Sequence, residues 1–162
     1  MSKENQKLSG QTSIITGSSS GIGKAMAIAL AKEGSNVVIN YHSSKEEAEE
    51  VAQKISEEKG SGEAIVIQGD MSKEDDVLNL FKTTIDKFGT MDVCIPNAGM
   101  QKDAAFHEMT LDDWNAVINL NLTGQFLCCR EAIKEFMRRG MRPDVSKSLG
   151  KIINMSSVHD IV

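Results

Sequence analysis

The amino-acid sequence predicts an α/β fold in which helices cover both faces of a doubly wound parallel sheet. Five short runs of apolar and β-branched residues alternate with segments that carry apolar residues at helical spacing. A turn with three glycines joins the first run to the first helical segment, and each run ends in a polar residue or a glycine. Because strands that alternate with helices are joined by right-handed crossovers, we expect the strands to run parallel.

The first strand is predicted at residues 13–16, and a helix follows the glycine-rich segment 16–23. Gly17 can adopt backbone angles that other residues avoid, Gly21 lets the backbone approach a pyrophosphate, and Gly23 removes a side chain where helix meets strand. The helix would direct its free N–H groups and the positive end of its dipole at the anion. We therefore interpret this segment as a phosphate-binding loop.

Two other interpretations of the loop fit less well. A Walker-type phosphate loop needs four residues between its first glycine and a Gly-Lys pair, followed by a hydroxyl residue. Here five residues separate Gly17 from Gly23, and Ala25 follows Lys24, which excludes that type. A structural turn without a ligand remains the alternative, although three glycines at a helix start are costly unless something must come close.

The other elements follow from apolar spacing and from residues that start or stop helices. Ser44 begins a capping-box pattern for a helix that extends to about residue 59, and Ser72 is the expected cap of the next helix. Thr110 opens a long helix over residues 110–139. Near-continuous apolar runs predict the remaining strands at residues 36–41, 64–67, 91–95 and 151–155.

Polar residues or glycines at all the predicted strand ends indicate a ligand site. In a doubly wound sheet, ligands bind beyond the carboxyl ends of the strands, where the strand order reverses. Turn chemistry alone would place some polar residues there. The strand-end residues are the glycine loop, Asn40, Tyr41 and His42, then Asp70, residues 97–99 and Ser157.

Composition and charge exclude several classes of protein. The 162 residues suit one domain, and the net charge of −5 without a basic stripe argues against nucleic acid or an anionic membrane as partner. The N-terminus is polar and no stretch is apolar enough to span a bilayer, so we expect a cytoplasmic protein, which the three cysteines fit. His42, His107 and His159 show no ligand spacing, and no metal site is predicted.

Several motifs in their chain order resemble the short-chain dehydrogenase/reductase family, over about residue 8 to the last residue. Within the family, residues 41–50, 131–134 and 154–159 are most similar to bacterial glucose 1-dehydrogenases. The resemblance implies that residues 1–162 are a single NAD(P)-binding Rossmann domain, the N-terminal portion of a longer fold. The motifs are Thr16-Gly17-x-x-x-Gly21-Ile22-Gly23, Asp70, Asn97-Ala98-Gly99, Asn121-Leu122-Thr123-Gly124 and Ile153-Asn154-Met155-Ser156-Ser157.

The resemblance also implies roles for individual residues. Asp70 would accept the adenine amino group, and residues 97–99 would support the adenine ribose side of the cleft. Ser157 would bond the substrate oxygen, and Asn121 would perturb its helix and hold a water in a proton relay, so these two are the catalytic candidates. The implied cofactor contacts are Gly17, Ser19, Ser20, Gly21, Ile22, Gly23, Tyr41, His42, Asp70, Met71, Asn97, Ala98 and Gly99.

Simpler explanations exist for three of these residues. Asp70 would then be a turn carboxylate, Asn121 a mid-helix residue bonding backward, and Ser157 a helix cap. The chain also departs from the family at Pro96, where asparagine is usual. Proline fixes the turn and removes an N–H donor, so the family's contacts at this position are not carried over to Pro96.

The family's catalytic base, a tyrosine with a lysine four residues later on the helix after the fifth strand, has no counterpart here. The only tyrosine is Tyr41, and residues 41–45 spell Tyr-x-x-x-Lys by coincidence, because they lie beside the adenosine ribose in this fold. We therefore expect a C-terminally truncated chain that is inactive alone. His42, Ser43, Ser44 and Lys45 occupy the place of the carboxylate that would select NAD, which favours NADP, with NAD possible.

Three functions are compatible with these observations. The first is an NAD(P)-dependent oxidoreductase that transfers a hydride between the nicotinamide and a sugar hydroxyl or carbonyl, or a carbonyl or 3-oxoacyl reductase of the same family. The second is a non-catalytic nucleotide-binding module. The third is an interaction protein that uses the 110–139 helix, since family members form homotetramers through this helix and the next one.

Overall fold

Five parallel strands form one sheet in the order β3-β2-β1-β4-β5. The computed structural model describes residues 6–157. The chain winds outward from β1 to β3 and then returns to β4 beside β1, so the strand order reverses between β1 and β4. This confirms the doubly wound parallel sheet. The strands are β1 (Thr12–Ile15), β2 (Asn36–Tyr41), β3 (Ala64–Gln68), β4 (Val93–Ile95) and β5 (Lys151–Ile152).

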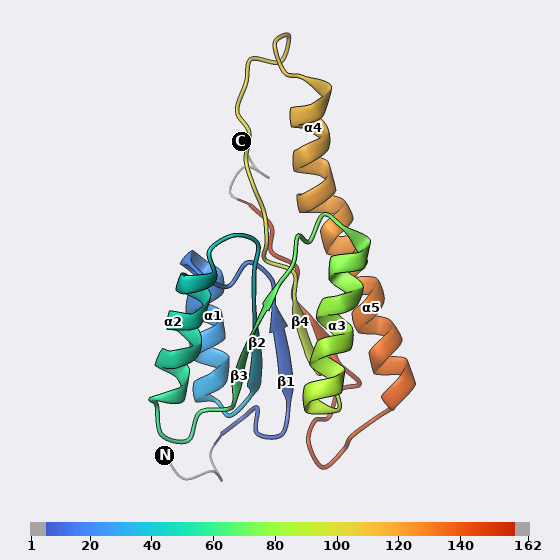
Figure 1. Cartoon of the computed structure of the whole chain (residues 1–162). Helices are drawn as coiled ribbons and strands as arrows, with labels where there is room; N and C mark the ends of the chain where they lie inside the picture. The colour runs from blue at the N-terminus through green and yellow to red at the C-terminus, as the bar shows by residue number, and fades with distance from the viewer. Residues whose placement is uncertain (1–5, 158–162) are drawn as a thin grey trace.

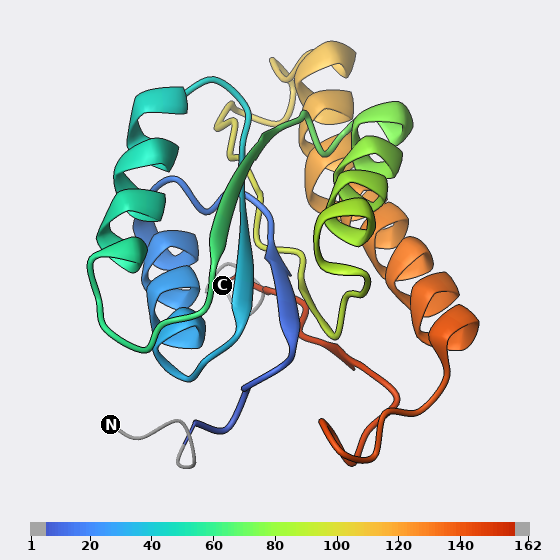
Figure 2. The ribbon, with the colours of Figure 1, turned by 60° about the horizontal axis from the view of Figure 1, so that its bottom comes forward.

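Helices cover the two faces of the sheet in pairs. Figures 1 and 2 show α1 (Gly21–Lys32) and α2 (Lys45–Ser56) on one side, and α3 (Glu74–Phe88) and α5 (Gly124–Arg139) on the other. The short α4 (Leu111–Ile118) extends beyond the end of the sheet together with the loop that precedes it (Figure 1). This projecting part lies at the carboxyl end of the strands, where the ligand site is predicted.

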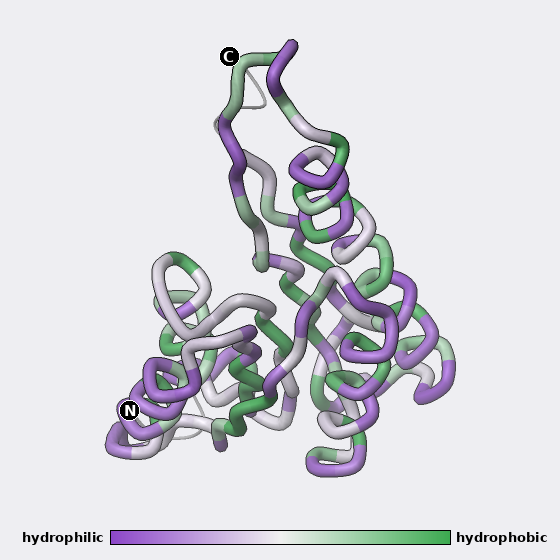
Figure 3. The backbone as a smooth tube through the Cα atoms, turned by 45° about the horizontal axis from the view of Figure 1, so that its top comes forward, coloured by the Kyte–Doolittle hydropathy of each residue, from purple (hydrophilic) through white to green (hydrophobic). Residues whose placement is uncertain are grey.

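Alternate residues of each strand point to opposite faces of the sheet and belong to two separate hydrophobic cores. Ile14 and Val38 pack toward α3 and α5, whereas Ile15, Val37 and Ile39 pack toward α1 and α2. Figure 3 shows hydrophobic stretches along the central strands and hydrophilic residues along the covering helices. Burial on both faces explains why these strands are near-continuously apolar.

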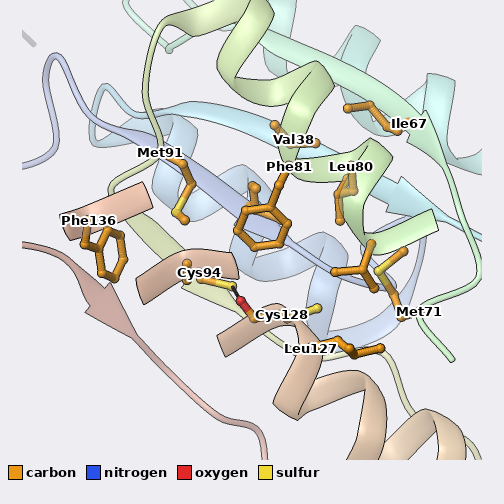
Figure 4. Packing of buried hydrophobic residues seen from close by; sticks show 13 residues of the cluster. Val38, Ile67, Met71, Leu80, Phe81, Met91, Cys94, Leu127, Cys128 and Phe136 are labelled. Carbon is orange, nitrogen blue, oxygen red and sulfur yellow. Dashed lines mark hydrogen bonds between the residues drawn. The ribbon is translucent and has the colours of Figure 1, made fainter. Parts of the chain in front are cut away.

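The core under α3 and α5 is shown in Figure 4. Leu80 and Phe81 of α3 point toward a layer that contains Cys94 of β4 and Leu127 and Cys128 of α5. The Cys94 thiol donates a weak hydrogen bond to the carbonyl oxygen of Cys128 at 3.9 Å. This layer fixes α5 against β4, and α5 is continuous with the turn that approaches the ligand site.

The helix predicted over residues 110–139 is interrupted by a π-helical turn, η2 (Asn119–Thr123). Its start is as predicted, because the Thr110 hydroxyl accepts the backbone N–H of Asp113 at 3.1 Å. The turn contains Asn121, so the perturbation of the helix at this residue is confirmed. Such π-turns are frequent at functional sites.

The two other expected helix caps are confirmed only in part. Ser44 is the N-cap residue of α2, as predicted, but its side chain makes no capping hydrogen bond. Lys73, and not Ser72, is the N-cap residue of α3. The Ser72 hydroxyl instead points back to the strand end and donates to Asp70 Oδ1 at 2.7 Å.

Strand β5 is shorter than predicted, although its path continues. Only Lys151–Ile152 form a ladder with β4. Beyond them, the Ile153 N–H donates to the carbonyl oxygen of Cys94 at 3.0 Å. The Met155 N–H donates to the carbonyl oxygen of Pro96 at 3.4 Å. The chain therefore stays beside β4 as it enters the ligand site.

Two further findings concern residues 6–157. No helix in this part of the chain is both long and apolar enough to cross a bilayer. Nor do three His, Cys, Asp or Glu side chains within it gather in a way that could hold a metal ion. His159 lies outside the described residues.

Candidate functional site

Two clefts open at the carboxyl end of the sheet and share one wall. The first, which we call the cofactor-side cleft, has a volume of about 570 Å³ and lies between the glycine loop and the ends of β2 and β3. The second, the substrate-side cleft, has a volume of about 1010 Å³ and lies between η2 and the end of β5. The shared wall is formed by Asn97, Ala98, Gly99 and Met100, which follow β4.

Two glycines of the loop are required by close packing. A Cβ at Gly23 would lie 2.5 Å from the carbonyl oxygen of Gly17 and 2.7 Å from Asn97 Nδ2, so α1 can begin here only with glycine. Gly17 has φ of +60°, and a Cβ there would lie 3.0 Å from Ala98 Cα. These contacts bring the glycine loop directly against the shared wall.

Gly21 differs from the other two because it faces open space. Its φ is +55°, and a Cβ there would meet no atom within 4 Å. Neither a capping side chain nor a first-turn carboxylate occupies the N-terminus of α1 in the described structure. Unused helix N–H groups next to open space are suited to an anion such as a pyrophosphate. The residues present therefore fit a dinucleotide phosphate.

Asn40, at the end of β2, holds the glycine loop in place. The side chain is buried, with 1% of the residue exposed, and its Oδ1 accepts the Gly17 N–H at 3.0 Å. Its Nδ2 donates to the carbonyl oxygen of Gly69 at 3.1 Å. The Ser18 hydroxyl, also buried, donates to Ile15 at 2.7 Å and accepts the Asn40 N–H at 3.2 Å. One buried network thus links the ends of β1, β2 and β3.

Thr16 and Asn97 fix the shared wall to the glycine loop. The Thr16 hydroxyl accepts the N–H groups of both Asn97 and Ala98 at 2.9 Å. In return, Asn97 Nδ2 donates to the carbonyl oxygens of Thr16 at 2.9 Å and Gly17 at 3.2 Å. Pro96 does not disturb this arrangement, because the bonds come from the two residues that follow it.

Asp70 lies at the far side of the cofactor-side cleft. Its Oδ1 accepts from the Ser72 hydroxyl and N–H, while its Oδ2 lies 4.0 Å from His42 Nε2 and 3.9 Å from Lys73 Nζ. Burial tends to raise the pKa of Asp70, but the Ser72 hydrogen bonds and the charges of His42 and Lys73 outweigh it and lower the pKa. Asp70 is thus a turn carboxylate whose second oxygen stays beside the cleft.

Tyr41 and Lys45 do not form a catalytic pair. Tyr41 lines the cofactor-side cleft, yet it is only 7% exposed and packs in the core beneath α1 and α2. Lys45 Nζ lies 3.4 Å from Glu49 on the surface of α2. Neither residue lines the substrate-side cleft, which supports the interpretation of this sequence match as a coincidence.

Asn121 bonds across to the shared wall. Its Oδ1 accepts the Met100 N–H at 2.9 Å, and its Nδ2 donates to the Met100 carbonyl oxygen at 2.8 Å. The side chain therefore does not bond backward along its own helix, as the simpler explanation held. It ties η2 to the segment that separates the two clefts.

The substrate-side cleft combines polar residues with exposed apolar walls. Asn121 and Ser157 both line it, so the structure brings the two catalytic candidates to one cleft. Trp114 is 51% and Leu122 63% exposed on its helical side. The arrangement offers hydrogen-bonding groups near the end of β5 and an apolar surface opposite them.

Most of the predicted cofactor residues lie in one cleft, and three others begin α1. Gly21, Ile22 and Gly23 form the first turn of α1 beside the cleft. The sequence places Thr16 and Ser18 in the glycine loop and Asn40 at a strand end, but it does not indicate the buried hydrogen bonds by which these three side chains hold the site together. The predicted residues that line the cofactor-side cleft are Gly17, Ser19, Ser20, Tyr41, His42, Asp70, Met71, Asn97, Ala98 and Gly99.

Comparisons with known proteins agree with this geometry. Glucose 1-dehydrogenase 2 of Bacillus subtilis is 41% identical over 153 residues, which are 94% of this chain and 56% of that protein. The crystal structure of a short chain dehydrogenase from Burkholderia cenocepacia in complex with NADP is similar at a TM-score of 0.82 and 30% identity, covering 94% of this chain and 57% of that one.

A double mutant of a Serratia marcescens short-chain dehydrogenase/reductase has the same TM-score of 0.82 at 27% identity, again over 94% of this chain and 57% of that chain. This chain thus spans a little over half the length of these relatives. A family model described as short chain dehydrogenase matches residues 11–161. Together with the glycine loop and the strand-end residues, this match shows that the chain belongs to the short-chain dehydrogenase/reductase family.

Proposed function

We propose that this chain supplies the NADP(H)-binding portion of an oxidoreductase that acts on a sugar hydroxyl or carbonyl. The observation that carries the proposal is the pair of clefts that share the wall of residues 97–100. One cleft has the glycine loop and an uncapped helix N-terminus, and the other has Asn121 and Ser157. A molecule that extends along both would have its phosphates at one end and its reactive end at the other.

Each part of the site has a task in this proposal. Gly21 and the first turn of α1 bind the pyrophosphate, and Asp70 accepts a hydrogen bond from the adenine amino group. The nicotinamide, when bound, supplies the hydride acceptor or donor. Ser157 bonds the substrate oxygen, while Asn121 keeps Met100 and the shared wall in position and its π-turn holds a water. The proton-transferring base is not among these residues.

The preference for NADP is supported by the residues after β2. His42, Ser43 and Ser44 line the cofactor-side cleft without a carboxylate at the position that would bind the ribose of NAD. Lys45 follows at the start of α2 and adds a positive charge, although Glu49 partly neutralises it. A phosphate on the ribose would therefore meet hydroxyl and cationic groups, and NAD would bind more weakly.

The sugar substrate is supported by the similarity to a glucose 1-dehydrogenase at 41% identity. Carbonyl and 3-oxoacyl reduction by the same family remain the alternatives, and the cytoplasmic location and homotetramer of a longer form remain predictions. Because the sequence has one tyrosine, which is largely buried in the core, we predict that the 162-residue chain binds cofactor without turnover.

Two measurements on the 162-residue chain test the proposal. Titration of NADPH fluorescence is expected to give saturable binding that NADP competes and NAD competes less well. Formation of NADPH from NADP and glucose, followed at the absorbance of the reduced cofactor, is expected to be absent. Glucose-dependent NADPH formation would refute the predicted inactivity, and absence of any NADPH binding would refute the cofactor role and favour an interaction protein.

A further inference from the structure

The π-helical turn η2 borders both clefts. Asn119 and Leu120 line the cofactor-side cleft, whereas Asn121 and Leu122 line the substrate-side cleft. Successive pairs of residues in one turn thus face two different clefts. Any displacement of this turn must change the shape of both.

Gly124, directly after η2, approaches the loop that follows β3. A Cβ at Gly124 would lie 2.6 Å from the carbonyl oxygen of Met71 and 3.3 Å from its carbonyl carbon. The backbone angles of Gly124 are ordinary helical ones, φ −60° and ψ −42°, so this position does not need glycine for its conformation. Glycine is needed because two backbones come together, and a backbone carbonyl cannot swing aside as a flexible side chain can.

Both sides of this contact lead to candidate site residues. Met71 follows Asp70, is 3% exposed and lines the cofactor-side cleft. On the other side, Asn121 bonds the Met100 N–H at 2.9 Å and the Met100 carbonyl oxygen at 2.8 Å. Gly124 therefore links two parts of the site. On one side it contacts Met71, which follows Asp70, and on the other it continues into η2, whose Asn121 bonds Met100 in the shared wall.

We infer that Gly124 is a positioning residue for both clefts. By admitting the Met71 carbonyl, it fixes η2 where Leu120 shapes the cofactor-side cleft and Asn121 holds Met100. Gly124 itself lines neither cleft, so it acts only through its neighbours. The inference rests on the proposed function, because its main readout is the affinity of the cofactor-side cleft for NADP(H).

The test compares Gly124→Ala with Gly62→Ala in the 162-residue chain. Gly62 is the control for general destabilisation, because a Cβ there would collide more severely with a backbone carbonyl, that of Ser35, while Gly62 lines neither cleft. We expect Gly124→Ala to raise the Kd for NADPH about tenfold, since an inserted methyl group must displace the turn or the Met71 loop. Gly62→Ala is expected to lower the melting temperature and leave that Kd unchanged.

Nuclear magnetic resonance gives a second readout, the chemical shifts near η2, which a general loss of stability would leave unchanged. In Gly124→Ala, the side-chain amide signals of Asn121 and the backbone amide of Met100 are expected to shift, whereas in Gly62→Ala they keep their wild-type positions. Unchanged signals together with an unchanged Kd in Gly124→Ala would overturn the inference. So would equal changes in both glycine variants.

Two further outcomes are also decisive. If Gly124→Ala does not fold, Leu120→Ala replaces it, because it removes the side chain by which the same turn packs on the core. A wild-type Kd and wild-type Met100 signals in Leu120→Ala would then overturn the inference. If the wild-type chain fails to bind NADPH, the proposed function fails, and the Asn121 and Met100 signals of Gly124→Ala still decide whether Gly124 positions the turn.

Discussion

The two clefts at the carboxyl end of the sheet are built in different ways. The cofactor-side cleft is framed by polar side chains that are themselves buried, since Thr16, Ser18 and Asn40 are each at most 1% exposed. The substrate-side cleft is walled by side chains that remain accessible, among them Trp114 at 51% and Leu122 at 63%. One cleft is held by a buried hydrogen-bond network, and the other by separate bonds, among them those of Asn121 to Met100 and that of Gln125 to the Met155 carbonyl oxygen.

This difference separates binding from chemistry in the same chain. Buried polar groups that are fully bonded fix a single geometry, because any shift leaves one of them unpaired in a low-dielectric environment. The cofactor-side cleft should therefore be preformed. Exposed apolar walls impose no such constraint, so the substrate-side cleft should tolerate change with little loss of stability.

The largest effect is expected from Asn40→Ala, which removes the centre of the buried network. The Gly17 N–H and the Gly69 carbonyl would lose their partner, so we expect the free energy of unfolding to fall by about 3 kcal/mol and NADPH binding to be lost. Urea unfolding followed by circular dichroism measures the free energy of unfolding, and fluorescence titration measures NADPH binding. The control is Asn115→Ala on the exposed side of α4, which should be nearly neutral. Equal effects of the two variants would contradict a preformed cleft.

Thr16→Val tests the shared wall. The substitution keeps the shape of the side chain but removes the acceptor of two N–H groups, those of Asn97 and Ala98. We expect a loss of about 2 kcal/mol in unfolding free energy and weaker NADPH binding. Thr83→Val on α3, whose hydroxyl makes only an exposed contact of 3.5 Å, provides the comparison. A Thr16 variant as stable as the Thr83 variant would show that the wall is held by other contacts.

Asn121→Ala should act mainly on the substrate-side cleft, because Asn121 lies outside the buried network that holds the glycine loop, although Met100 borders both clefts. The two bonds to Met100 are exposed, so water can replace them, and the expected loss of stability is about 1 kcal/mol. The Kd for NADPH should remain close to the wild-type value, while the backbone amide signal of Met100 shifts. A loss of NADPH binding as large as that of Asn40→Ala would remove the distinction between the clefts.

The smallest effect concerns pH and Asp70. Because the pKa of Asp70 is lowered in the folded protein, its carboxylate contributes stability at pH values above its unfolded pKa, and this contribution is lost as the pH falls through the folded pKa. In Asp70→Asn, the decline of unfolding free energy below about pH 4 should be shallower than in the wild type. Asp144→Asn, at an exposed loop position, should leave the slope unchanged.

The sequence predicts the cofactor-side cleft better than the interactions that hold it. Its glycines and strand ends follow from local patterns, and the sheet order places them together. The partners of Asn40 and Thr16, however, lie as much as 29 and 82 residues away along the chain. No local pattern indicates which strand end a buried hydroxyl or amide will meet. These contacts appear only once the register of the strands is known.

Competition between neighbouring groups explains the local errors. Ser72 has the residue type and place of a helix cap, but Asp70 lies two residues before it and accepts its hydroxyl. The resemblance to the family indicated a perturbed helix at Asn121, yet helical apolar spacing alone predicted a continuous helix there. Its bonds to Met100 cross 21 residues and require the end of β4 to be in place.

An equilibrium titration of NADPH fluorescence with the 162-residue chain tests the preformed cofactor-side cleft most directly. We expect saturable binding that is competed by NADP, is lost in Asn40→Ala and is retained in Asn121→Ala. Absence of saturable binding in the wild-type chain, or its retention in Asn40→Ala, would contradict the claim that these residues form a preformed dinucleotide cleft.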